Sequence, residues 1–120
     1  MTARAGDPRR ALGARGEELA AEWYVRHGYE VVARNWRCKE GELDLIVRTN
    51  RTYVFCEVKT RRSTAFGAPV EAVTRDKQMR IRRLAARWLE DRAPGPARDI
   101  RFDVASVLGP KDVEVIEGAF

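Results

Sequence analysis

Apolar residues recur along this chain at steps of three and four over two segments. This spacing predicts two helices, because residues so spaced share one helix face. The first is expected from about Ala11 to His27, with Gly28 suited to end it, and the second from about Thr74 to Arg92. The apolar stripe of the first contains Leu12, Gly16, Leu19, Ala20, Trp23 and His27. The stripe of the second contains Ile81, Leu84, Ala85, Trp88 and Leu89.

Elsewhere apolar and polar residues alternate, as they do in strands. Only residues 49–51 separate the second such segment from the third, which predicts a hairpin. In the fourth segment, Ile100, Phe102 and Val104 are expected to face the core. The five predicted strands are Tyr29–Asn35, Glu42–Arg48, Thr52–Thr60, Ile100–Leu108 and Val113–Ile116.

The order of these elements, α-β-β-β-α-β-β, defines the expected fold. A strand, a helix and a further strand usually form a right-handed crossover between parallel strands. We therefore predict an α/β fold, in which a mixed β-sheet is flanked by helices. Residues 1–10 are expected to form a basic flexible tail and residues 11–120 a single domain of ordinary size.

The composition favours a polyanionic partner. The chain of 120 residues has a formal net charge of +5, with 19 Arg against 4 Lys. A guanidinium binds phosphate through two hydrogen bonds, so this balance favours nucleic acid, although a GC-rich genome would produce the same enrichment.

No apolar run is long enough to span a membrane, and the polar first residues give no sign of a secretion signal. With Cys38 and Cys56 outside any metal-binding spacing, we expect reduced thiols and a cytoplasmic protein.

Acidic residues gather on one face of the predicted hairpin. Because strand side chains alternate, Glu42 and Asp44 share a face of their strand, as do Glu57 and Lys59 of theirs. A turn at residues 50–51 places Asp44 opposite Glu57, at about 5 Å between Cβ atoms. Two opposed carboxylates destabilise a sheet, so a cation should compensate for them.

Two interpretations of this face stay open on spacing alone. In the first, Asp44 and Glu57 bind Mg²⁺ together with the Val58 carbonyl, since this ion takes one or two carboxylates plus waters and substrate phosphate. Lys59 would then orient the attacking water or stabilise the charge that develops on the phosphate. In the second, the face is an ordinary solvated one and Lys59 is the counter-ion of Glu57. The chain contains no phosphate-binding loop motif that would indicate a nucleotide cofactor.

Asp44, followed by Glu57-Val58-Lys59, resembles the PD-(D/E)xK nuclease motif. Longer blocks between about residues 11 and 118 resemble the YraN-type family of small bacterial nuclease-like proteins. These blocks are Gly16-Glu17, residues 34–37, residues 41–46, residues 54–61 and residues 101–104. The family is similar to archaeal Holliday-junction resolvases, so the resemblance implies a restriction endonuclease-like fold and, because resolvases act as dimers, a homodimer.

The resemblance implies a nuclease that hydrolyses DNA with Mg²⁺ or Mn²⁺, at branched or recombination structures. Asp44, Glu57 and Lys59 match its catalytic positions. Glu17 matches a helix glutamate that helps to bind metal, and it lies at the edge of the predicted stripe. Gln78 matches a supporting position, and Glu42 is expected to orient a ligand or a water. The alternative function is a non-catalytic module that binds nucleic acid or recruits a partner.

Other polar residues have simpler expected roles. Asp103 should form a structural ion pair with Arg101, and His27 should serve packing or helix capping. Lys77 and Gln78 extend the stripe of the second helix by one turn and should lie near the polar end of the sheet. There Lys77 is expected to lay its stem along apolar surface and reach water. The candidates for nucleic-acid contact are Arg34, Trp36, Arg37, Arg61, Arg62, Arg80, Arg83 and Arg87.

Overall fold

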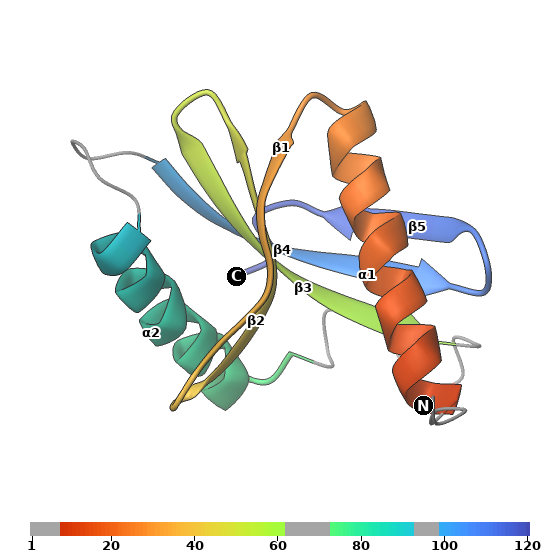
Figure 1. The fold of residues 1–120 in the computed structure, drawn as a ribbon, viewed down its shortest axis with the longest axis horizontal. Helices are drawn as coiled ribbons and strands as arrows, with labels where there is room; N and C mark the ends of the chain where they lie inside the picture. The colour runs from red at the N-terminus through yellow and green to blue at the C-terminus, as the bar shows by residue number, and fades with distance from the viewer. Residues whose placement is uncertain (1–7, 62–72, 93–98) are drawn as a thin grey trace, which may run out of the picture.

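The molecule is built on one five-stranded sheet with a helix on each side (Figure 1). The structure is a computed structural model that describes residues 8–61, 73–92 and 99–120. The strands lie in the order β1-β2-β3-β4-β5, and only β3 and β4 are parallel. This confirms the predicted α/β fold and the order α-β-β-β-α-β-β. The elements are α1 (Pro8–Arg26), β1 (Glu30–Cys38), β2 (Gly41–Thr49), β3 (Thr52–Arg61), α2 (Arg75–Arg92), β4 (Asp99–Leu108) and β5 (Asp112–Ile116).

Two element ends differ from the prediction by three residues, and the others differ by at most one. Helix α1 begins at Pro8, three residues before the expected start, since proline fits the first helical turn, where its missing N–H is not needed. Residues 8–10 of the expected tail are therefore helical, while residues 1–7 lie outside the described residues. Strand β1 continues to Cys38 because it pairs with β2 as far as Gly41. The loop expected after β3 also falls outside the described residues.

The two helices cover opposite faces of the sheet (Figure 1). Helix α1 packs Ala20 and Tyr24 against Leu45 on one face. Helix α2 packs its predicted stripe on the other face, where Ile46 and Phe55 are 0% and 1% exposed. The alternative of an ordinary solvated face is therefore wrong, because the crossover helix between β3 and β4 covers it.

Buried polar groups near β4 are satisfied locally. Asp103 is fully buried, accepts hydrogen bonds from Arg101 Nε at 2.9 Å and Tyr24 Oη at 2.6 Å, and so forms the predicted structural ion pair. One prediction for this strand is wrong, because Ile100 is 46% exposed near the start of β4. His27 is exposed at the end of α1, where it stacks on Trp23 and its Nδ1 lies 2.7 Å from the Trp23 carbonyl oxygen, which agrees with the predicted packing or capping role. No helix in the described part of the chain is long and apolar enough to span a membrane.

Candidate metal and nucleic-acid site

The two central strands β2 and β3 separate at the acidic residues. Their pairing runs from Thr49–Thr52 to Leu45–Cys56, which confirms the predicted register. Beyond that pair, β2 stays with β1 while β3 stays with β4 as far as Arg61. Asp44 and Glu57 therefore lie one step past the last pair instead of within the ladder. We call this point the fork.

A pocket of about 340 Å³ lies at the fork. It brings together residues from four elements that are distant along the chain. Six of its lining residues are ones that the sequence singled out for the metal site: Glu17, Glu42, Asp44, Glu57, Val58 and Lys59. The others lie on α2 and are Lys77, Ile81, Leu84 and Arg80, which is a candidate for nucleic-acid contact.

Asp44 bridges the two separating strands. Its Oδ2 accepts a hydrogen bond of 2.9 Å from the Val58 N–H, which replaces the ladder bond lost where the strands part. Burial, and after it the neighbouring Glu57, raises the pKa of Asp44 to about 7. The Glu57 side chain is itself only 7% exposed. The pocket thus confines two carboxylates that cannot both ionise without cost.

Glu17 and Glu42 complete the acidic lining. Burial and the charge of Asp44 raise the pKa of Glu17, as expected for a third carboxylate near the first two. Glu42 accepts a hydrogen bond of 2.8 Å from Arg37 Nε, which ties a predicted nucleic-acid residue to the rim of the pocket. Glu42 is therefore already paired with a cation at the surface.

Two lysines face these carboxylates. Lys59 is half-buried, and burial, followed by the neighbouring Lys77, lowers the pKa of Lys59. Lys77 Nζ lies 3.3 Å from Glu57 Oε2. Burial would lower the pKa of Lys77, but interactions with Lys59 and Glu57 outweigh it and raise that pKa. Lys77 therefore lies near the polar end of the sheet, as its spacing of four from Ile81 predicts, but its ammonium pairs with Glu57 instead of only reaching water.

Gln78 does not line the pocket at the fork. Its side-chain amide donates a 3.0 Å hydrogen bond to the Val73 carbonyl, just before α2. Next to it, Thr74 Oγ1 accepts from the Lys77 N–H at 3.2 Å and so caps the helix. These two bonds fix the first turn of α2 and thereby the direction of Lys77.

The candidate nucleic-acid residues that the structure describes lie on three different elements, and of them only Arg80 lines the pocket at the fork. Arg34 and Arg37 are exposed on β1, while Trp36 is half-buried and packs against the α2 side of the core. Arg61 lies at the end of β3, and Arg62 falls outside the described residues. Three arginines of α2 line a second hollow of about 430 Å³ together with Glu40 and Leu84, namely Arg80, Arg83 and Arg87. Of these, Arg87 is paired with Glu40, and Arg80 also lines the pocket at the fork.

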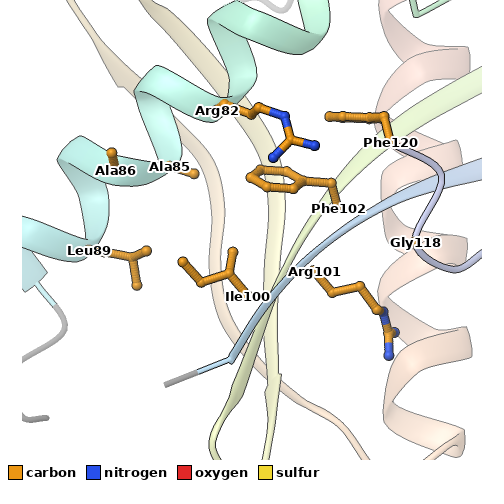
Figure 2. Close-up of a pocket in the computed structure, with 9 residues that line it drawn as sticks. All are labelled: Arg82, Ala85, Ala86, Leu89, Ile100, Arg101, Phe102, Gly118 and Phe120. Atoms are coloured by element: carbon orange, nitrogen blue, oxygen red, sulfur yellow. The ribbon is translucent and has the colours of Figure 1, made fainter. Parts of the chain in front are cut away.

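A larger hollow of about 540 Å³ lies between α2 and β4 (Figure 2). The Arg82 guanidinium lies 4.6 Å from the centre of the Phe102 ring, with Phe120 beside it. Its lining is otherwise mostly apolar and contains no carboxylate side chain. The hollow is therefore a poor place for a metal ion, which points back to the fork.

The donor set at the fork fits a hard divalent cation. Among residues 8–61, 73–92 and 99–120, no three His, Cys, Asp or Glu side chains form a ready-made metal cluster. Mg²⁺ needs fewer protein ligands, because it commonly takes one or two carboxylates and keeps several waters. Asp44 and Glu57 supply two carboxylates whose mutual repulsion a cation would relieve. They are the residues that would hold the ion.

Gly16 sets the distance between α1 and β3 beside Glu17. A Cβ at this position would lie 1.9 Å from Thr60 Oγ1 and about 3 Å from the other two Thr60 side-chain atoms, so the contact stays tight even if Thr60 rotates. We expect Gly16→Ala to lower the free energy of unfolding by about 1–3 kcal/mol in thermal or urea unfolding. Gly13→Ala is the matched control, because that position has open space and alanine favours helix. A Gly16→Ala variant as stable as Gly13→Ala would contradict the close approach.

The fold and the site together define a class of protein: an α/β protein with a pocket between two separating strands, lined by carboxylates and lysines. The family described as "Uncharacterised protein family UPF0102" matches residues 16–107, and the chain belongs to it. A UPF0102 protein of Nocardia farcinica is 60% identical over 108 residues, covering 90% of this chain and 84% of that protein. A UPF0102 protein of Frankia alni is 50% identical over 124 residues and covers both chains fully. The YraN-type resemblance is thus confirmed at the level of the family.

Proposed function

We propose that this chain is a metal-dependent nuclease that hydrolyses DNA phosphodiester bonds, with branched or recombination structures as its substrates. One observation carries the proposal: Asp44 of β2 lines one pocket together with Glu57 and Lys59 of β3, and these are the residues of the D…ExK motif. The parallel pairing of β3 and β4 supports the restriction endonuclease-like assignment that the resemblance implies.

The side chains of the pocket have distinct parts in this chemistry. Asp44 and Glu57 would hold Mg²⁺ or Mn²⁺, with Asp44 oriented by the Val58 N–H. The bound ion would act as a Lewis acid on the scissile phosphate. Lys59 would orient the attacking water and stabilise the charge that develops on the phosphate. Its lowered pKa also suits it to exchange a proton with that water.

The arginines of α2 would hold the DNA backbone beside the pocket. Arg80 borders both the pocket at the fork and the adjacent hollow that Arg83 and Arg87 line, so a phosphate chain could pass from one to the other. Guanidinium contacts of this kind make binding steeply dependent on salt. We place this activity in the cytoplasm and, by likeness to the resolvases, in a homodimer.

A non-catalytic module that binds nucleic acid is the second candidate function. It is favoured by the contact of Lys77 with Glu57, which already provides the acidic pair with a cation in the absence of a metal ion. Such a module would retain the arginine contacts but would gain nothing from a divalent cation.

Incubation with linear and four-way branched DNA separates the two functions. The purified protein should cut DNA only with Mg²⁺ or Mn²⁺, and excess chelator should stop the reaction. Retained DNA binding without cleavage of either substrate, with either metal, would contradict the nuclease proposal and leave the binding module.

A further inference from the structure

Lys77 stands where a cation is needed in the pocket at the fork. Its ammonium lies 3.3 Å from Glu57 Oε2, and it comes from α2, outside the D…ExK motif. The Glu57 side chain is 7% exposed and that of Lys77 is 32% exposed, so the pair is mostly removed from water. Truncating one member of such a pair leaves the other charge buried and unpaired, which is strongly destabilising.

The first turn of α2 holds Lys77 in this direction. Thr74 Oγ1 accepts from its N–H, and Gln78 ties the same turn to the Val73 carbonyl. The Lys77 stem, with three rotatable donors at its end, can still swing between neighbouring anions. The backbone is therefore fixed while the ammonium remains free to change partner.

We propose that Lys77 is an exchangeable counter-ion, which pairs with Glu57 in the metal-free protein and leaves it when a divalent cation binds there. This inference rests on the proposed function, because it takes Asp44 and Glu57 as the metal-binding carboxylates. An ammonium and a divalent cation cannot share Glu57 without strong repulsion, since both charges would lie within about 4 Å of each other. Lys77 is thus a positioning residue that sets how tightly the bare protein binds metal.

Titration calorimetry with Mn²⁺ alone, without DNA, tests the exchange. Lys77→Met keeps the length of the stem and removes the charge, so its Mn²⁺ affinity should rise by at least about tenfold. Lys77→Arg keeps a cation beside Glu57 and should stay within about threefold of wild type. Lys111→Met, at an exposed turn between β4 and β5, is the control for the change in net charge and should also match wild type.

Thermal melting gives a second readout of the same exchange. Metal-free Lys77→Met should melt lower than wild type, and Mn²⁺ should raise its melting temperature by more than it raises that of wild type. If Lys77→Met does not fold without metal, Lys77→Gln replaces it, because its amide still donates to Glu57 without the charge.

The outcomes separate this inference from the proposed function. Equal Mn²⁺ affinity in wild type and in the neutral variants would overturn the exchange while the metal site stands. Binding by the neutral variants but not by wild type would support the exchange in its strongest form. No binding by any variant would overturn both the exchange and the metal site.

Discussion

Replacement of Glu57 by glutamine is expected to lower DNA cleavage by at least about a thousandfold. Glutamine keeps the shape of the side chain but lacks the charge that would hold a divalent cation. The effect should be large because Glu57 is one of the two carboxylates that would hold the ion, and its side chain is only 7% exposed. Initial cleavage rates with Mg²⁺ in excess measure it.

The control for this substitution is Glu114→Gln. Glu114 is an exposed glutamate on the edge strand β5, so the same chemical change there should leave the cleavage rate within about twofold of wild type. DNA binding by Glu57→Gln should also persist, because the arginines of α2 are unchanged. Cleavage by Glu57→Gln at the wild-type rate would show that the reaction takes place elsewhere.

Asp44→Asn is expected to stabilise the metal-free protein at pH 8 and to leave it nearly unchanged at pH 4. The pKa of Asp44 is raised to about 7 in the folded protein, above its ordinary value of 3.8, chiefly by burial and then by Glu57. The folded protein therefore binds more protons than the unfolded chain between these two values. Its stability falls as the pH rises through that window, and the full cost is present above it.

The size of this stabilisation follows from the shift in the pKa of Asp44. One pKa unit corresponds to about 1.4 kcal/mol, so ionised Asp44 costs on the order of 2–4 kcal/mol in the metal-free protein. Asparagine mimics the protonated carboxyl, since it accepts from the Val58 N–H and donates to Glu57. The melting temperature at pH 8 should rise by roughly 8–16 °C. Asp112→Asn, an exposed change at the start of β5, should not alter it.

The same variant should lose the response to metal. Mg²⁺ should raise the melting temperature of wild type by an amount that grows with its concentration, because it binds only the folded state. Asp44→Asn removes one of the two carboxylates and should show little of this gain. If Asp44→Asn destabilises the metal-free protein at pH 8, Asp44 is a structural residue instead of a strained site residue.

The elements and the central register could be predicted from the sequence because local patterns determine them. The alternation in Thr52–Arg61 and the short turn before it place Cys56 opposite Leu45, as the structure has it. The stripe from Ile81 to Trp88 likewise identifies the buried face of α2. Both signals are contained within one or two adjacent elements.

The fork could not be predicted in this way. Extending the register by one step puts Asp44 in the ladder, whereas β2 leaves β3 there because each strand keeps its other neighbour, β1 or β4. Such competition between partners is a property of the whole sheet. The ion pair of Lys77 with Glu57 could not be predicted for a similar reason, since this contact depends on where the crossover helix α2 lies on the sheet.

Diffraction from a crystal soaked in Mn²⁺ tests the metal site most directly. The account predicts one anomalous peak in the pocket at the fork, about 2.0–2.4 Å from carboxylate oxygens of both Asp44 and Glu57, with the Lys77 ammonium moved away from Glu57. Bound water should complete the coordination, with Glu17 close enough to bind directly or through one of those waters. A saturating soak with no peak at the fork, or a peak that contacts neither Asp44 nor Glu57, would contradict the account.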